Sequence, residues 1–362
     1  MSLIDWIHIG TTGKCNFRCE YCYAAKDQLP SYNDLTISDF EHFVIPALQK
    51  MKPNAVDFEG GEPLYEWDRL IKLIKLIDEE VSSVETFQMT TNGSLLTEKR
   101  IKQLLDLTNK EWDIVVSIDT FQKEKDIRSP RSYQAVRKSL ELCEQHGVLD
   151  AISLVVTNQN YWEIESILEK YKNSETLVLC FPIIPHYPQH EQFGLTFNQL
   201  TTLDAILLKN FLNPAFFPSP MPINPEVWKE VEPILEKTNF RQYLGCTALK
   251  YDISIRPDGT VKPCQVFNLE IGDLKTQTIE EILNLPLVQK IKAYDQYEGK
   301  CGKCKYNHSC LGGCRARAHL ETENFFGEVV TCEGGPEGHP LEEIATSIFL
   351  DSIRRLEWDQ TS

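Results

Sequence analysis

The sequence has no hydrophobic run long enough to cross a membrane and no excess of positive charge. None of its apolar stretches approaches the roughly 18 residues that a membrane span needs, and the segment Met1–Trp6 lacks the basic and apolar parts of a signal peptide. These absences predict a cytoplasmic protein. Lys and Arg number 37 against 53 Asp and Glu, which gives a net charge of −16. This charge argues against a nucleic acid as partner, because phosphate binding needs a basic surface.

Cysteine, by contrast, is abundant. The chain has 12 cysteines in 362 residues. All but Cys143 and Cys180 fall into two groups, at residues 15–22 and 246–332. Without a sign of export, disulfides are not expected, and clustered cysteines in a reducing compartment more often bind metal.

The first half of the sequence alternates between strand-like and helix-like segments. Strands are expected at residues 6–9, 55–58, 86–89, 114–119, 152–156 and 177–181. Helices are expected at residues 38–50, with Ser38 as N-cap, and at 70–77, 97–107, 132–146 and 161–171. This alternation predicts a parallel sheet with right-handed crossovers. An open sheet and a full or partial barrel both fit, and in both the functional residues lie at the carboxyl ends of the strands.

The second half of the sequence is less regular. Prolines recur from Pro182 onward, with helices expected at 198–212, 226–237 and 341–356 and a hairpin turn at 256–260. The predicted domains are residues 1–184, a bridging segment 185–240, a cysteine-rich domain 241–335 and a terminal helix 336–362.

The first cysteine group has the spacing Cys15-x3-Cys19-x2-Cys22. Three thiolates on one short loop suit three irons of a 4Fe–4S cluster and leave the fourth iron open for chemistry. Zinc is the alternative, but it normally takes a fourth protein ligand, and the nearby candidate His8 lies inside an expected strand.

The segment Cys15-Asn-Phe-Arg-Cys19-Glu-Tyr21-Cys22-Tyr23 resembles the signature of the radical S-adenosylmethionine (SAM) superfamily. The resemblance implies a partial (β/α)6 TIM-like barrel, with SAM and a SAM-binding 4Fe–4S cluster as cofactors. Such enzymes reductively cleave SAM to a 5′-deoxyadenosyl radical that abstracts a hydrogen atom from the substrate.

Two further parts of the expected SAM site follow from this resemblance. The sequence Gly60-Gly61-Glu62-Pro63 resembles the glycine-rich motif that binds the methionyl amine, and glycines let backbone carbonyls approach an ammonium group closely. By position, Tyr21 is expected near the adenine.

Three strand-end residues complete the expected SAM contacts. Ser117 and Arg128 resemble the family's contacts to the ribose and the SAM carboxylate, and Arg131 is the alternative to Arg128 because either suits a carboxylate. Asn92 is expected to support the same pocket or to form a turn with Gly93.

The second cysteine group resembles the SPASM extension of radical SAM enzymes. Its pattern is a cysteine, then Gly-x4-Cys, then Cx2Cx5Cx3C and a last cysteine, and all seven positions are present. The resemblance implies two auxiliary 4Fe–4S clusters in a domain with a β-hairpin and short helices. The outer cluster is assigned to Cys301, Cys304, Cys310 and Cys332, and the nearer one to Cys246, Cys264 and Cys314. The fourth ligand of the nearer cluster stays open, and a structural zinc ribbon is the alternative for the whole group.

The resemblance predicts an oxidoreductase that crosslinks a ribosomally made precursor peptide through thioether or carbon–carbon bonds. Expected partners are that peptide, a separate leader-binding protein, and an electron donor such as flavodoxin or ferredoxin. A dehydrogenase or epimerase acting on a small molecule, and a noncatalytic electron carrier, remain alternatives. Sulfatase-type formylglycine formation is disfavoured, because those enzymes carry a basic aspartate where this sequence has Gln265.

No catalytic base is assigned. Glu59, Asp119 and His186 are candidates. Cys180 is expected to be a buried structural cysteine, although its place at a strand end also allows it to face the barrel interior.

Overall fold

The computed structural model describes residues 4–24, 33–128, 133–209, 222–235, 245–293 and 296–359. The chain forms two compact units. The first comprises residues 1–156, 173–192 and 248–292, and the second residues 157–172, 193–247 and 293–362. Within the described ranges, no helix has both the length and the apolar character that crossing a bilayer requires.

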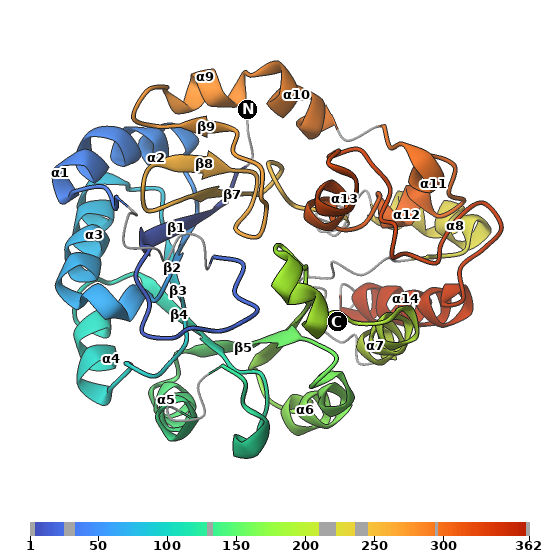
Figure 1. Cartoon of the computed structure of the whole chain (residues 1–362), viewed down its shortest axis with the longest axis horizontal. Coiled ribbons are helices and arrows are strands. Elements are labelled where there is room, and N and C mark those ends of the chain that lie inside the picture. The colour runs from blue at the N-terminus through green and yellow to red at the C-terminus, as the bar shows by residue number, and fades with distance from the viewer. Residues whose placement is uncertain are drawn as a thin grey trace. The chain divides into compact units, whose positions relative to one another are not determined.

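The first unit contains a nine-stranded open sheet with the order β6-β5-β4-β3-β2-β1-β7-β8-β9 (Figure 1). The strands are β1 (Trp6–Thr12), β2 (Ala55–Gly60), β3 (Thr86–Thr91), β4 (Glu111–Ser117), β5 (Leu149–Val156), β6 (Leu177–Pro182), β7 (Asp252–Ile255), β8 (Thr260–Lys262) and β9 (Gly272–Asp273). β1 to β6 are parallel, and β7 adds to β1 in the same direction. The predicted α/β fold with a partial barrel is thus confirmed, and the sheet does not close.

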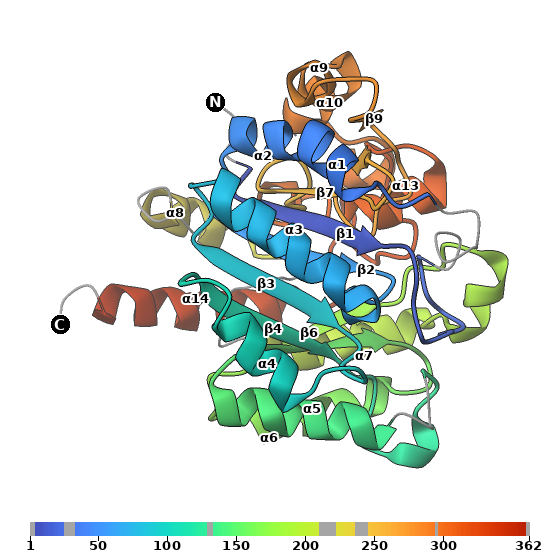
Figure 2. The ribbon, with the colours of Figure 1, turned by 90° about the vertical axis from the view of Figure 1, so that its left-hand side faces the viewer.

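Helices cover the apolar face of this sheet, and Figures 1 and 2 show α3 and α4 lying along its outer side. Their bounds are α1 (Ile37–Asp39), α2 (Ile45–Met51), α3 (Trp67–Glu80), α4 (Glu98–Leu105), α5 (Tyr133–His146), α9 (Ile279–Leu283) and α10 (Pro286–Ala293). Strand side chains such as Ile7, Phe58 and Phe87 are fully buried on this face. The apolar residues of α3, including Leu70 and Ile74, are also fully buried, so periodicity placed the helices correctly.

The first helical segment differs from the prediction in two ways. Its N-cap is Thr36, not Ser38, because Thr36 and Asp39 form a capping box with reciprocal side-chain bonds. The segment then passes through a π-helical turn at Phe40–Val44 before α2 begins.

The second unit is mostly helical. Its helices are α6 (Ile164–Tyr171), α7 (Phe197–Lys209), α8 (Pro225–Leu235), α11 (Gly299–Gly302), α12 (Asn307–Cys310), α13 (Arg315–Thr322) and α14 (Glu342–Asp359). The expected ends of two helices, at residues 210–212 and 236–237, lie outside the described residues. A buried cluster joins α8 and α14, where the rings of Trp228 and Phe349 stack with centroids 5.8 Å apart.

Candidate active site and cysteine groups

Cys15, Cys19 and Cys22 lie on the loop that follows β1. The backbone folds back on itself there, since Cys22 N donates to Cys19 O over 3.1 Å. Burial raises the pKa of Cys15 to about 11 and that of Cys22 to about 12, and the charges of Cys19 and Cys15 raise the pKa of Cys22 further. The three thiols are therefore neighbours in a poorly solvated place. Soft sulfur donors gathered on one loop fit an iron–sulfur cluster.

The glycine motif packs directly against this cysteine loop. Gly61 N donates to Thr12 O over 2.8 Å, and Glu62 N donates to Lys14 O over 2.9 Å. A Cβ on Gly61 would lie 2.2 Å from Lys14 O, and one on Gly60, whose φ is +136°, would lie 2.5 Å from Thr12 O. Only glycine fits at both positions, so the motif fixes the entry to the cysteine loop.

The buried Glu62 carboxylate connects three parts of the site. Oε1 accepts hydrogen bonds from Thr91 Oγ1 at 2.6 Å and Leu64 N at 3.1 Å, and Oε2 accepts one from Asn92 N at 2.7 Å. Burial raises the pKa of Glu62, and these three hydrogen bonds oppose the shift. The carboxylate thus links the glycine turn to the end of β3.

Asn92 reaches from the end of β3 to the cysteine loop. Its Nδ2 donates to Asn16 Oδ1 over 3.0 Å and lies 3.9 Å from Cys15 Sγ. Its Oδ1 accepts from the backbone nitrogen of Ser94 over 2.9 Å. The side chain therefore forms the expected turn and also contacts the residues around Cys15, while its role in a SAM pocket stays a prediction.

Tyr21, Asp119, Ser117 and Arg128 meet on the other side of the loop. The Tyr21 hydroxyl donates to the buried Asp119 carboxylate, and Arg128 donates to the carbonyl of Ser117. Burial raises the pKa of Asp119 to about 6, which Arg128 and Tyr21 oppose. Burial would lower the pKa of Arg128, but Tyr21, Asp119 and Cys19 raise it overall. The structure thus brings Arg128 next to the cysteine loop, whereas Arg131 lies outside the described residues.

Glu59, one of the candidate bases, belongs to a buried polar cluster on the other face of β1 and β2, and the cluster itself was not predicted from the sequence. His8 Nδ1 lies 3.0 Å from Asp57 Oδ2. Glu59 lies on the same face, and its Oε1 accepts a hydrogen bond from Ser254 Oγ over 3.4 Å. Burial lowers the pKa of His8, but the Asp57 bond and the nearby carboxylates raise it to about 9. Burial raises the pKa of Glu59 to about 7. The sequence feature that could have revealed this cluster is the presence of ionisable residues at alternate positions within two apolar strands.

Two other candidates are placed by the strand register. Cys180 pairs with Leu154 and shares its buried apolar face, away from the polar cluster, and burial raises the thiol pKa to about 12. Cys180 is therefore structural. The ring of His186 lies 5.9 Å from that of Tyr23, and burial lowers the His186 pKa to about 4.

The four cysteines assigned to the outer cluster all lie in the second unit. Cys301 and Cys310 belong to α11 and α12. Burial raises the pKa of Cys332 to about 11, with smaller contributions in the same direction from the charges of Cys301 and Cys304. Burial likewise raises the pKa of the Tyr297 phenol, with Cys246, Cys310 and Cys301 adding to the shift. These shifts indicate thiols near one another, and four sulfur donors fit a closed cluster.

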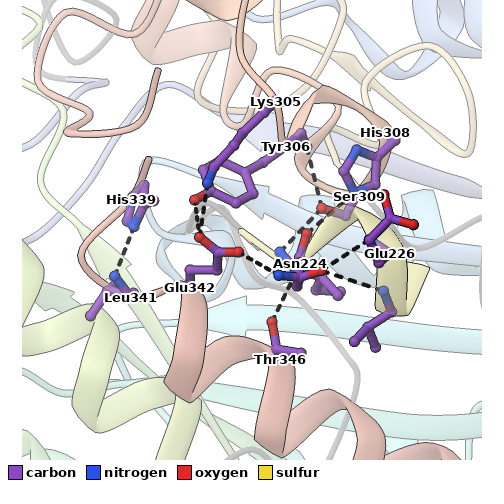
Figure 3. Close-up of polar contacts among 12 residues, drawn as sticks. Asn224, Glu226, Lys305, Tyr306, His308, Ser309, His339, Leu341, Glu342 and Thr346 are labelled. Carbon is purple, nitrogen blue, oxygen red and sulfur yellow. Dashed lines mark hydrogen bonds and ion pairs between the residues drawn. The ribbon is translucent and has the colours of Figure 1, made fainter. Parts of the chain in front are cut away.

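Short polar contacts secure the loops of this cysteine group. The Lys300 ammonium donates to the carbonyl oxygens of Val330 at 2.8 Å and Cys332 at 2.5 Å. Figure 3 shows a second network, in which the Glu342 carboxylate accepts from Lys305, Tyr306 and Asn224 over 2.5–3.1 Å.

The cysteines assigned to the nearer cluster belong to different units. Cys264 lies in the first unit, whereas Cys246 and Cys314 lie in the second. Their assignment to one cluster stays a prediction.

Two family models match parts of the chain, and Cys310, Cys314 and Cys332 lie beyond the matched residues. Residues 9–171 match the radical SAM superfamily, and residues 246–305 match the SPASM iron–sulfur cluster-binding domain.

Known proteins also resemble the whole chain. It is 23% identical to an AdoMet-dependent heme synthase of Methanosarcina barkeri, covering 91% of this chain and 95% of the relative. It is also 23% identical to the antilisterial bacteriocin subtilosin biosynthesis protein AlbA of Bacillus subtilis, covering 84% and 65%. The solved structure of native anSMEcpe with bound AdoMet and Cp18Cys peptide has a TM-score of 0.67 at 18% identity and covers 97% of both chains.

The fold, the three-cysteine loop and the later cysteine group define an iron–sulfur protein that uses SAM. The chain carries a region that matches the radical SAM superfamily, residues 9–171, and a region that matches the SPASM iron–sulfur cluster-binding domain, residues 246–305. SAM and 4Fe–4S clusters are therefore its cofactors, as predicted.

Proposed function

We propose that this chain is a radical SAM enzyme that oxidatively modifies a ribosomally made peptide, forming a thioether or carbon–carbon crosslink. One observation carries the first part of the proposal. The glycine turn packs on the loop that carries Cys15, Cys19 and Cys22, so the proposed SAM-binding motif lies beside the three proposed iron ligands.

In this proposal Cys15, Cys19 and Cys22 hold the SAM-binding cluster. When bound, the cluster and SAM supply a 5′-deoxyadenosyl radical that abstracts a hydrogen atom from the substrate. The remaining work of the protein is to bind, orient and exclude water. The poor solvation that raises the cysteine pKa values supports such a role for the loop.

The Glu62 carboxylate is suited to recognise the SAM amine together with Gly60 and Gly61. A carboxylate offers about four lone-pair sites, and three are occupied by Thr91, Leu64 and Asn92. The remaining site and the carbonyls of the glycine turn suit an ammonium group. The three internal bonds would hold the carboxylate in position before SAM binds.

Tyr21, Asn92, Ser117 and Arg128 complete the proposed SAM contacts. The bond from Tyr21 to Asp119 fixes the tyrosine ring, which suits stacking on the adenine. Arg128 supplies a positive charge beside the loop and is proposed to bind the SAM carboxylate.

The proposed auxiliary clusters have the ligands Cys301, Cys304, Cys310 and Cys332, and separately Cys246, Cys264 and Cys314. Auxiliary clusters suit an oxidative reaction because they can take up the electron left on the substrate after hydrogen abstraction. A peptide substrate is supported by the likeness to a bacteriocin biosynthesis protein and to a structure with a bound peptide. A flavodoxin or ferredoxin is the proposed electron donor, and a leader-binding protein the proposed partner for the precursor.

The experiment is anaerobic reconstitution with iron and sulfide, followed by an assay of 5′-deoxyadenosine made from SAM and dithionite. Cys19→Ala is expected to reduce the product to background, whereas Cys143→Ala, at a buried position in α5, is expected to retain it. An unchanged yield from Cys19→Ala, or zinc in place of iron in the wild type, contradicts the proposal.

A second candidate function is favoured by the heme synthase relative, which matches nearly the whole chain at the same identity as AlbA. Incubating the reconstituted enzyme with short precursor peptides encoded near its gene, and separately with iron porphyrins, distinguishes the two. Loss of a pair of hydrogen atoms from a peptide, located by tandem mass spectrometry, supports crosslinking. Production of heme supports the second candidate.

A further inference from the structure

Arg315 is a fully buried cation in the middle of the second cysteine group. It directly follows Cys314, at the start of α13, and its exposed fraction is 0%. Nη1 donates to the carbonyl oxygens of Phe325 at 3.1 Å and Gly327 at 2.7 Å, and Nη2 donates to that of Gly312. Its Nε, also buried, has no hydrogen-bond partner.

The charge of Arg315 has no protein counterpart in the described parts of the chain. All of its hydrogen-bond acceptors there are neutral carbonyls, and none of the ion pairs between described residues includes it. A guanidinium stays protonated in proteins. An isolated buried charge costs several kcal/mol unless a charge of opposite sign lies close by. The carbonyl dipoles satisfy Nη1 and Nη2 but leave Nε without a partner and the net charge of the guanidinium uncompensated, so this place favours a negative group.

The cysteines assigned to the outer cluster lie in the right place to supply it. Arg315 Cζ is 5.0 Å from the centre of the Tyr297 ring, the same ring whose pKa the thiols of Cys246, Cys310 and Cys301 raise. Gly312, between Cys310 and Arg315, has no room for a side chain, because its Cβ would lie 3.1 Å from Arg315 Cζ and 2.6 Å from Tyr297. The guanidinium, the ring and the loop that follows Cys310 are therefore in contact.

We propose that Arg315 is the counter-charge of the outer iron–sulfur cluster and raises its reduction potential. A 4Fe–4S cluster with four thiolates carries a net negative charge, and accepting one electron from the donor makes it more negative. A buried positive charge nearby stabilises the reduced form more than the oxidised one, and net charge and local dielectric are known determinants of cluster potential. This inference rests on the proposed ligands Cys301, Cys304, Cys310 and Cys332, and on no assumption about the substrate.

The experiment measures the reduction potential of the outer cluster in the reconstituted full-length protein, by electron paramagnetic resonance during a redox titration with dithionite. The signal of that cluster is identified as the one missing from Cys332→Ala. Arg315→Gln removes the charge, Arg315→Lys keeps it with fewer hydrogen bonds, and Arg317→Gln is the matched control. Arg317 lies on the same helix, where its Nη1 is 3.5 Å from Thr331 Oγ1.

Arg315→Gln is expected to lower the equilibrium constant for one-electron reduction at least about tenfold, which corresponds to a shift of about −59 mV. Arg315→Lys and Arg317→Gln are expected to keep the wild-type potential. If Arg315→Gln fails to bind the cluster while Arg315→Lys binds it, the charge is still required and the proposal holds.

An unchanged potential in Arg315→Gln overturns the proposal. Equal shifts or equal loss of the cluster in the Gln and Lys variants also overturn it, because the role of Arg315 would then be to hold the loop through its hydrogen bonds. A full iron content in Cys332→Ala, by contrast, refutes the proposed ligand set itself. Failure of the ligand assignment and failure of the counter-charge are thus distinguishable.

Discussion

The two cysteine groups are held in different ways. In the first group, three cysteines lie within eight residues of one loop, which is fixed from outside by the glycine turn and by Glu62. In the second, the four cysteines assigned to the outer cluster spread over residues 301–332, and long cationic side chains hold their loops through backbone carbonyls.

This difference indicates what each group needs. A site with three ligands must keep one coordination position open for a cofactor, so its loop has to be rigid without help from a fourth ligand. In a site with four cysteine ligands, the bound cluster itself ties the ligand loops together. The protein then needs only to keep distant loops near one another and to balance the charge of the cluster. The first arrangement relies on close backbone packing, and the second on polar side chains.

Gly61→Ala is expected to have the largest effect, because the first group depends on backbone packing. Its Cβ would lie 2.2 Å from Lys14 O, and neither backbone segment moves easily. We expect a loss of about 3 kcal/mol in the free energy of unfolding, measured by urea denaturation, with loss of iron from the first group.

The control for this change is Gly335→Ala in the second unit, where an added Cβ meets nothing within 4 Å. It is expected to alter the stability by less than about 0.5 kcal/mol. Equal effects of the two substitutions would contradict the contrast between the groups.

Glu62→Gln is expected to cost about 2 kcal/mol. Every partner of this carboxylate is a donor, so the amide nitrogen of glutamine would face one of them and leave it unsatisfied. The measurement is thermal unfolding together with the iron content. Glu66→Gln is the control, since Glu66 is partly exposed and forms its ion pair with the exposed Lys14, and it should have little effect.

His8, buried in the first unit, and His339, half-buried in the second, are expected to respond to pH with opposite signs. His8 has a folded-state pKa of about 9, above its ordinary value of 6.5, so its contribution is present below pH 6.5 and is lost as the pH rises through 9. His339 has a pKa lowered to about 4 by burial, so stability is lost as the pH falls from 6.5 towards 4.

Unfolding free energies measured from pH 4 to 10 check this prediction. His8→Asn is expected to remove about 1–2 kcal/mol of the alkaline decline, and His339→Gln to reduce the acid loss. A His8→Asn variant with the wild-type alkaline decline would show that the Asp57 contact does not hold the proton.

Lys300→Met is expected to have the smallest effect, about 1 kcal/mol. It removes the bonds to the carbonyls of Val330 and Cys332 but leaves the methylene chain in place. The measurement is the rate at which a chelator removes iron from the second group, which should rise. Lys303→Met, at an exposed position of the same segment, should leave that rate unchanged.

Much of the fold could be predicted because its signals are local. All six apolar runs of the first half became strands, and the expected hairpin at 256–260 joins β7 to β8. The pairing of β7 with β1 was not predicted, since a contact between residues about 245 positions apart has no local signal. The choice between an open sheet and a closed barrel was undecidable for the same reason.

The cysteine and glycine motifs of the site were predicted from their spacing in the sequence. The contacts that these motifs make through packing were not predicted. The sequence placed Gly60 and Gly61 near a ligand, but their contact with Thr12 and Lys14 appears only when β1 and β2 are paired. The carbonyl bonds of Arg315 follow from loops that no periodicity describes.

The parallel pairing of β1 with β7 also affects how the protein is made. Among the strands of this sheet β1 is synthesised first, but its second neighbour, Asp252–Ile255, follows some 240 residues later. Until then one edge of β1 offers unpaired N–H and C=O groups, beside a loop of three reactive thiols. We therefore expect the nascent chain to need protection from aggregation and oxidation during most of its synthesis, and the first cluster to be inserted late.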